Sequence, residues 1–415
     1  MKKWLKISVS LILLLVRENL SAQTSAFLLM YQDSLFEGRH SYLEVSAQGA
    51  IGSDLLNNAF MKRMYLGGHL EDGLLNGLVD DAREQNRAGL DAKFSMQWWD
   101  LTSGLFGNPC LQLMVGISSE NHGYVGFSKD FFSLVYRGNS GWAGQTKEIG
   151  PLYAGYQSFQ KFSVGIVDQR TYSQYRLSFV SGQDFTSIDI RDASLYTSSD
   201  LDSLVLTYEG KMYVADPNKR GIGSGKGLGL SFDFDWNIPM KDGKGWFSVS
   251  AYNLGMIRWN GQTENYNLDS SFVWTGFELN DLFTIDDDLS MPELADTIGY
   301  TMKTQSKWVS LPADIRVRML RRLDRVLFID AGIALQPYQL SLPELRFALG
   351  QDINGKWQFT EQVMFGGYGG FRAGIGIRSA AIKNFILQAG SENLMGWLGE
   401  DFRGRDFSVA ISRIF

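Results

Sequence analysis

Apolar and polar side chains alternate along much of the chain. The longest examples are residues 89–99, 225–236 and 308–320. A period of two predicts β-strands that carry one apolar face and one polar face. In the last of these stretches the apolar positions are Val309, Leu311, Ala313, Ile315, Val317 and Met319. Shorter examples occur at 43–51, 111–119, 162–166, 204–214, 327–333, 371–377 and 385–389.

This alternation fits a membrane barrel or a soluble sandwich or propeller. Many of the stretches are about nine to eleven residues long, which is the length that a tilted strand needs to cross a bilayer. Aromatic side chains stand near strand ends, as interfacial girdles require; these are Trp98, Trp99, Trp236, Trp246, Trp308 and Trp357. We therefore predict an all-β protein, a transmembrane antiparallel β-barrel of about 14 strands (14–16), with a soluble secreted β-protein as an alternative.

The N-terminus has the pattern of an export signal. A basic start, MKKWLK, precedes an apolar run over residues 7–16, and cleavage is predicted after Ala22. We expect residues 1–22 to be a signal peptide, 23–41 a plug or lead-in, and 42–415 the barrel. The plug prediction rests on the apolar segment 26–35, and a disordered lead-in is its alternative. The expected location is the cell outer membrane.

Composition excludes several classes of function. The net charge is −6 and there is no basic cluster, so nucleic acid is not a predicted partner. Cys110 is the single cysteine and the three histidines lack metal-binding spacing. We predict no catalytic residue, no metal and no cofactor, and therefore no enzyme activity.

The polar face of the predicted strands should line the barrel lumen, because a charge facing lipid costs about 2–4 kcal/mol near the midplane. Mixed signs in one lumen suggest cross-barrel ion pairs, either as a sealing network or as a selectivity filter. The lumen-facing candidates are Lys93, Gln97, Arg176, Glu209, Lys211, Asp233, Asp235, Asp314, Arg316, Arg318, Arg372 and Arg378.

Residues 126–151 break the strand pattern with helical spacing. Ser128 is the predicted N-cap and Gly138 the predicted C-cap. The helix could fold into the lumen, contact lipid or a partner, or simply pack within a loop. Its predicted apolar face consists of Phe127, Phe131, Phe132, Val135 and Tyr136.

Five segments together resemble a FadL-like outer-membrane β-barrel family of uncharacterised function. They read MYLGGHLEDGLLNGL (64–78), REQNRAGLDAKFS (83–95), RGNSGWAGQT (137–146), YNLGMIRW (252–259) and LPADIRVRM (311–319). The family occurs in bacteria with type 9 secretion and is related at the level of fold to the shuttle protein PorV. The resemblance implies an outer-membrane barrel of about fourteen strands with an N-terminal plug.

Two functions follow from a plugged outer-membrane barrel. The first is binding or passage of a small amphipathic ligand through the lumen. The second is a non-transporting role as accessory or partner subunit in an outer-membrane assembly or in type 9 secretion. The expected partners are outer-membrane lipid, the outer-membrane assembly machinery during biogenesis, and an envelope protein in the second case.

The chain ends on DFSVAISRIF, which has the form of a closing barrel strand with a terminal aromatic residue. Such an ending resembles the recognition signal of the outer-membrane assembly machinery. The residues that carry it are Phe407, Val409, Ile411 and Phe415, and Arg413 departs from the pattern.

Deletion of Phe415 is expected to lower the amount of inserted barrel, because the terminal aromatic residue of the signal is lost. Heat-modifiable folded protein in the outer-membrane fraction measures the effect. Normal abundance of folded barrel after the deletion would refute the assignment of this signal.

Overall fold

The computed structural model describes residues 39–219, 221, 223–274, 300–338 and 340–415. The predicted signal peptide and nearly all of the predicted plug at 23–41 lie outside the described residues. Within the described residues, no helix is both long and apolar enough to cross a membrane.

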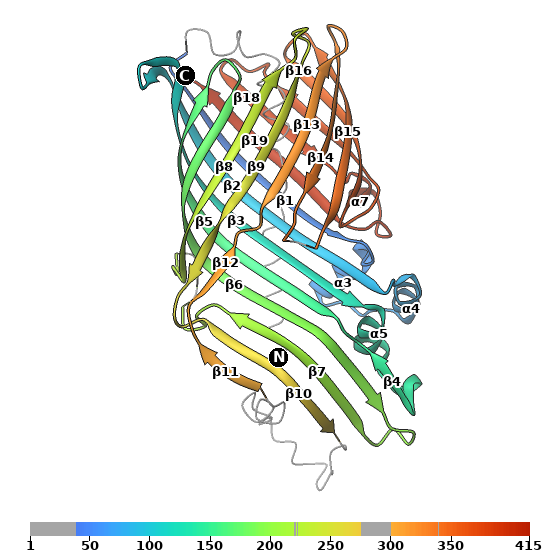
Figure 1. The fold of residues 1–415 in the computed structure, drawn as a ribbon. Helices are drawn as coiled ribbons and strands as arrows, with labels where there is room; N and C mark the ends of the chain where they lie inside the picture. The colour runs from blue at the N-terminus through green and yellow to red at the C-terminus, as the bar shows by residue number, and fades with distance from the viewer. Residues whose placement is uncertain (1–38, 220, 222, 275–299, 339) are drawn as a thin grey trace.

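Fourteen antiparallel strands form one closed barrel (Figure 1), which confirms the predicted fold class. Each strand pairs with its neighbour around the ring in the order in which we give them here. They are β1 (Ser41–Ser53), β2 (Gln85–Leu105), β3 (Asn108–Ser128), β5 (Leu152–Asp168), β6 (Ser173–Thr197), β8 (Gly227–Pro239), β9 (Gly245–Trp259), β13 (Asp314–Arg322), β14 (Leu327–Leu335), β15 (Leu342–Ile353), β16 (Trp357–Gly367), β17 (Arg372–Ser379), β18 (Phe385–Ser391) and β19 (Arg405–Ile414).

The last strand closes the ring against the first. The ladder between β1 and β19 runs from Tyr42 opposite Ile414 to Ile51 opposite Arg405. Closure pairs the backbone groups that an open edge would leave exposed. The prediction that the C-terminal segment is a closing barrel strand is therefore confirmed.

The two rims of the barrel differ. Short turns join β2 to β3, β5 to β6, β8 to β9, β13 to β14, β15 to β16 and β17 to β18 at one rim, where the C-terminus also lies (Figure 1); we call it the turn rim. The opposite loop rim carries the remaining connections, which include all of the long ones. Beyond it, the outer half of β6 continues into a sheet with β4 (Gln145–Glu148), β7 (Leu204–Val214), β10 (Glu264–Trp274) and β11 (Tyr300–Thr304).

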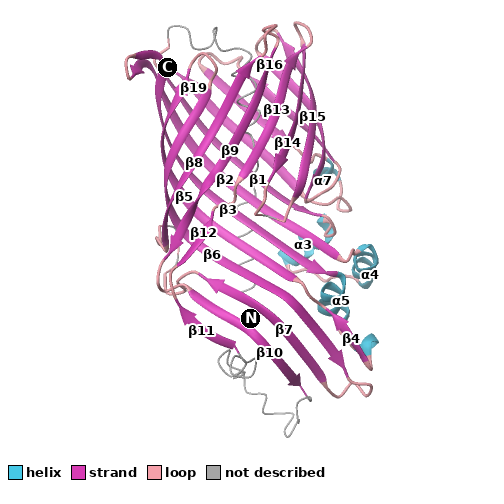
Figure 2. Ribbon diagram, in the orientation of Figure 1, coloured by secondary structure: helices cyan, strands magenta, loops and turns pink. Residues whose placement is uncertain are grey.

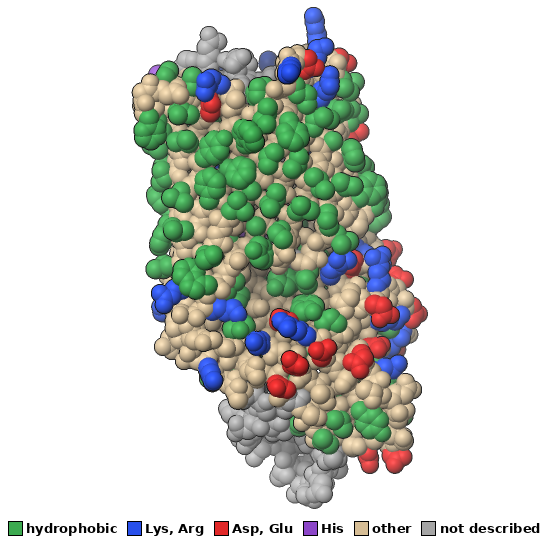
Figure 3. Space-filling model, viewed as in Figure 1, with side chains coloured by type: hydrophobic (Ala, Val, Ile, Leu, Met, Phe, Trp, Pro, Cys, Tyr) green, Lys and Arg blue, Asp and Glu red, His purple; other side chains and the backbone are tan. Residues whose placement is uncertain are grey.

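The barrel exterior is an apolar belt. One row of paired, exposed side chains runs across six strands through Met96, Ile117, Phe162, Phe179, Leu230 and Met256. Figure 3 shows apolar side chains covering the wall from the turn rim down to a zone of charged side chains near the loop rim. A soluble protein rarely exposes so large a contiguous apolar surface, so this belt is a surface for lipid.

The helices lie against the outside of the wall near the loop rim (Figure 2). They are α3 (Asn58–Leu66), α4 (Asp72–Asp81), α5 (Lys129–Arg137), the short helix η1 (Ser140–Trp142) and α7 (Met395–Leu398). Phe127 and Val125 share the outward-facing parity of Ile117, and they pack with α3, α4 and Phe132 of α5 in one buried cluster.

Helix α5 therefore packs within the loops and does not constrict the lumen. Its predicted caps are confirmed, because the Ser128 side chain accepts a hydrogen bond from the Phe131 amide and Gly138 ends the helix at φ 75°. Of its predicted apolar face, Phe127 and Phe132 are buried, Phe131 and Tyr136 pack partly, and Val135 is exposed.

Aromatic rings inside the barrel lie directly over glycines of its strands. The Phe328 ring covers Gly350, where an added Cβ would lie 1.7 Å from the ring. Tyr368 covers Gly89 in the same way. The missing side chain makes room for the ring, so these glycines are required by packing.

Gly350→Ala is expected to destabilise the barrel by roughly 1–3 kcal/mol, because Phe328 must leave its position. The temperature at which the folded band disappears in heat-modification gels measures the loss. Gly73→Ala in α4 is the control, since nothing lies within 4 Å of its added Cβ. A normal melting temperature for Gly350→Ala would contradict the packing argument, and Phe328→Leu in the same chain should recover part of the loss.

Candidate functional site: a charged lumen between an apolar layer and an outer cavity

A bulge in β9 turns two consecutive side chains into the lumen. Pairing between β8 and β9 shifts register after Phe232, and Asn253 adopts a left-handed conformation with φ 58°. Asparagine tolerates that conformation better than most residues, and bulges redirect side chains in this way. As a result Tyr252 and Asn253 both face inward, where strict alternation would send one of them outward.

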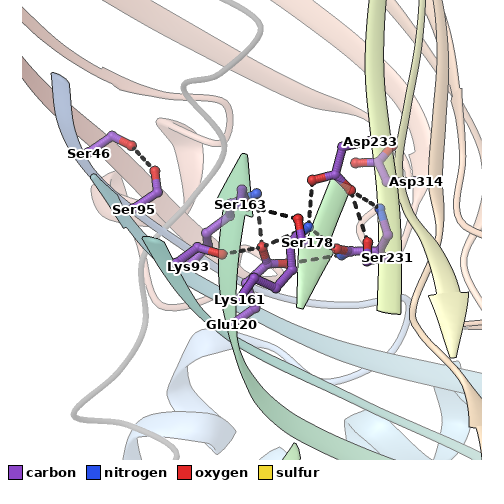
Figure 4. A network of polar contacts seen from close by, with 12 residues as sticks. Ser46, Lys93, Ser95, Glu120, Lys161, Ser163, Ser178, Ser231, Asp233 and Asp314 are labelled. Atoms are coloured by element: carbon purple, nitrogen blue, oxygen red, sulfur yellow. Dashed lines mark hydrogen bonds and ion pairs between the residues drawn. The ribbon is translucent and has the colours of Figure 1, made fainter. Parts of the chain in front are cut away.

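An ion network reaches from this bulge across the lumen (Figure 4). The Lys161 ammonium on β5 lies 2.6 Å from Asp233 Oδ2 on β8 and 2.8 Å from Asn253 Oδ1. Asn253 Nδ2 donates a 2.9 Å hydrogen bond to Glu120 on β3. Lys93 on β2 lies 3.1 Å from the same carboxylate.

The network is buried and almost fully paired. The side chains of Glu120, Lys161 and Asp233 are 1%, 2% and 5% exposed. Burying a charge costs several kcal/mol unless partners and hydrogen bonds replace water. The contacts meet this requirement and tie β3 and β5 to β8 and β9, so they brace the barrel from inside.

Tyr252 lies among cations beside this network. Its hydroxyl donates a short hydrogen bond to Asp235, which also pairs with Arg176 at 3.4 Å. Lys93, Arg176 and Arg316 all lie within 6.0 Å of the Tyr252 ring centre. The electron-rich ring face is attractive to cations at this range, so the phenol helps to hold three like charges together.

A second charged group lies on β13 to β17 and the loop before β19. Arg346 pairs with Glu392 at 3.2 Å, Arg318 with Asp330 at 3.4 Å, and Arg372 with Glu344. Lumenal cavities of about 100 Å³ and about 70 Å³ adjoin the two charged groups. At roughly 30 Å³ per water, they hold a few water molecules each.

His122 belongs to the first network and not to a reactive site. Its Nδ1 lies 2.6 Å from Asp91 Oδ1, and its Nε2 lies 3.4 Å from Glu120 Oε2. Both ring nitrogens therefore face carboxylates, and the ring stacks on Phe159. Among the described residues, no group of three acidic, histidine or cysteine side chains is arranged to hold a metal ion.

An apolar layer crosses the lumen near the turn rim. Its buried side chains come from β1, β2, β3, β5, β13, β14, β18 and β19 and from the turn before β6, and β1 and β13 stand opposite each other in the ring. The members are Tyr42, Trp99, Met114, Val167, Tyr172, Leu320, Phe328, Ile386 and Ile414. Trp99 and Trp246, predicted to lie in an interfacial girdle, instead belong to this layer or pack against it.

At the loop rim the lumen widens into a cavity of about 260 Å³. Tyr124, Phe185 and Tyr338 contribute aromatic side chains to its lining, and Lys307 and Gln157 contribute polar ones. The cavity also reaches His122, so it borders the ion network. From the turn rim outward, the lumen thus changes from apolar to charged to aromatic.

The predicted lumen-facing residues fall into two sets. One set lies on barrel strands and faces inward; it contains Lys93, Gln97, Arg176, Asp233, Asp235, Asp314, Arg316, Arg318, Arg372 and Arg378. Glu209 and Lys211 lie on β7, in the sheet beyond the ring, and both are exposed. They pair with Asp192 and Asp189 of β6, and the barrel does not enclose them, so they do not line the lumen.

Sequence reasoning missed the centre of the network. The alternating stretches at 111–119 and 162–166 each stop one residue short of Glu120 and Lys161. Longer strands would have included both residues. No sequence signal pointed to Asn253, because its role depends on the bulge.

A closed antiparallel barrel with an apolar exterior and a charged interior defines a transmembrane β-barrel protein. A family model described as "Family of unknown function (DUF5723)" matches residues 56–385, and the chain belongs to this family. No curated protein sequence matches the chain.

Several solved structures align with most of the chain at very low identity. A deletion mutant of the monoaromatic hydrocarbon channel TodX has 9% identity, a TM-score of 0.43 and 93% coverage of each chain. The Ralstonia pickettii toluene transporter TbuX has 9% identity and a TM-score of 0.36, covering 91% of this chain and 89% of that one. A Pseudomonas aeruginosa FadL homologue has 9% identity and a TM-score of 0.39, covering 91% and 90%.

Lys161→Met is expected to lower the free energy of unfolding by roughly 3–5 kcal/mol, because Glu120 and Asp233 lose a buried partner. The urea midpoint of the purified barrel in detergent, followed by tryptophan fluorescence, measures this loss. Lys211→Met on the exposed face of β7 is the matched control and should stay within about 0.5 kcal/mol of the wild type. An equal effect of the two substitutions would show that the network does not brace the wall.

Proposed function

We propose that this chain is an integral outer-membrane barrel that takes a small amphipathic ligand into its lumen from the loop side. The carrying observation is the 260 Å³ cavity at the loop rim, which combines aromatic walls with an ammonium group and an amide. Such a mixture of apolar surface and a few polar groups is typical of ligand pockets. The turn rim faces the periplasm in this proposal, as short turns do in outer-membrane barrels.

The lumen supports binding or gated passage better than free diffusion. A permeating molecule would meet the ion network and then the apolar layer around Trp99 and Leu320. Even a short apolar constriction in a pore can exclude water and ions. Passage would therefore require the apolar layer to open. A ligand could occupy the cavity at the loop rim without that opening. The same proposal includes export directed by a signal peptide at residues 1–22 and a plug at residues 23–41.

Native mass spectrometry of the barrel, extracted from outer membranes and ionised intact, tests the proposal directly. We expect a bound small molecule in a population of folded barrels. A ligand-free mass in every preparation, together with no saturable binding from a library of amphipathic compounds, would overturn the proposed function.

A second candidate is an accessory subunit in outer-membrane assembly or in type 9 secretion. The observation that favours it is that the ion network and the apolar layer both cross the lumen. A barrel that is braced at two levels also suits the role of a scaffold. Crosslinking in cells followed by extraction in mild detergent tests it. A stable complex of defined composition would support this candidate, and recovery of the lone barrel alone would argue against it.

The wild-type barrel is expected to show no steady conductance in a planar bilayer, because the apolar layer spans the lumen. Combined Trp99→Ala and Leu320→Ala substitutions should produce stepwise conductance, since they remove apolar volume from opposite walls of the layer. Phe94→Ala, which truncates an exposed side chain on the lipid face, is the control and should remain silent. A conducting wild type would show that the layer does not seal the lumen.

A further inference from the structure

The cavity at the loop rim has flat, well-supported aromatic walls. Tyr124 lies over Gly155, where an added Cβ would come within 2.4 Å of its ring. Phe185 stacks on Trp259 with ring centres 5.3 Å apart and an angle of 19° between the planes. These neighbours limit the rotation of both rings. The surfaces that face the cavity therefore suit a flat, rigid molecule.

One ammonium group at the cavity has no acidic partner. The Lys307 Nζ lies 2.9 Å from the centre of the Tyr213 ring. Within the part of the chain that the structure describes, Lys307 has no carboxylate at ion-pair distance and no further polar contact. The other basic side chain in the cavity lining, His122, differs because it faces Asp91 and Glu120. An anion arriving in the cavity would complete the charge balance at Lys307.

One acceptor at the cavity is also unsatisfied. Gln157 donates from Nε2 to the Ser310 carbonyl at 3.1 Å, whereas its Oε1 is buried without a hydrogen-bond partner among the described residues. A buried acceptor without a donor costs free energy that a ligand can recover. Gln157 sits on β5 and Lys307 on the short strand β12 (Lys307–Ser310), so the two groups approach the cavity from different elements.

From this geometry we propose that the cavity binds a small aromatic carboxylate, with the carboxylate on Lys307 and a polar substituent donating to Gln157. The cavity volume corresponds to roughly nine water molecules at about 30 Å³ each, which suits one ring with short substituents. The ring lies against Tyr124 and Phe185. This inference rests on the proposed function and names the ligand class and the site.

Isothermal titration of the full chain in detergent micelles tests the charge. The probes are benzoate and, as its uncharged match, benzyl alcohol. Saturable benzoate binding is expected, with affinity at least about tenfold lower in Lys307→Ala, because a charge-assisted hydrogen bond is lost. Lys307→Arg should retain most of the affinity. Lys303→Ala, four residues earlier on the exposed side of β11, should bind as the wild type does.

A third probe, 4-hydroxybenzoate, tests Gln157. Its hydroxyl group can donate to Oε1, so it should bind several-fold more tightly than benzoate in the wild type and lose that advantage in Gln157→Leu. Melting temperatures of all variants separate lost binding from lost folding.

Three outcomes overturn the inference: no saturable benzoate binding, equal affinity for benzoate and benzyl alcohol, or benzoate affinity that Lys307→Ala leaves unchanged. Each leaves the proposed function standing if native mass spectrometry still finds a bound small molecule of another class. The proposed function fails separately, when the barrel binds no small molecule of any class.

Discussion

The contact between Lys161, Asp233 and Glu120 is the constraint on which the lumen depends. A barrel of fourteen strands is wide enough to leave space inside, and its inward faces must be hydrated or must satisfy one another. Here a lysine on β5 meets carboxylates from β3 and β8, and Asn253 completes the set from β9. Opposing stretches of wall are thereby held at hydrogen-bond distance. The ion network therefore separates the apolar layer near the turn rim from the outer cavity at the loop rim.

The bulge at Asn253 makes this ion network possible and also disturbs the neighbouring strand. Opposite it, pairing with β9 is interrupted between β12 (Lys307–Ser310) and β13, at residues 311–313. Leu311 is fully buried and packs with Ile257 and Trp259 inside the mouth. One backbone irregularity therefore positions a network residue and also brings β12 inward, so that Gln157 reaches the Ser310 carbonyl.

Alternation predicts the exterior of the barrel well, because lipid contact imposes the same rule on every residue of a face. It predicts the interior less well. Val309 and Leu311 were expected on the same face as Ile315, yet they pack into the mouth, because the register changes at the break before β13. Tryptophan is a residue type typical of interfacial girdles, but Trp99 lies inside the apolar layer. Glu209 and Lys211 lie on a strand outside the ring and do not line the lumen. Periodicity reports the local direction of a side chain, whereas ring membership and cross-barrel contact depend on pairings between distant segments.

The unequal strand lengths give the barrel a slanted mouth. Strand β6 has 25 residues and β17 has eight, so at about 3.3 Å per residue β6 is roughly 56 Å longer than β17. The tall side carries helices α3, α4 and α5 on its outer surface and the extra sheet beyond the ring (Figure 1). On the low side, strands β14 to β18 have between seven and twelve residues each. In the function proposed above, a molecule would therefore enter the lumen more readily across the low side of the wall than across the tall side, so that uptake would have a direction.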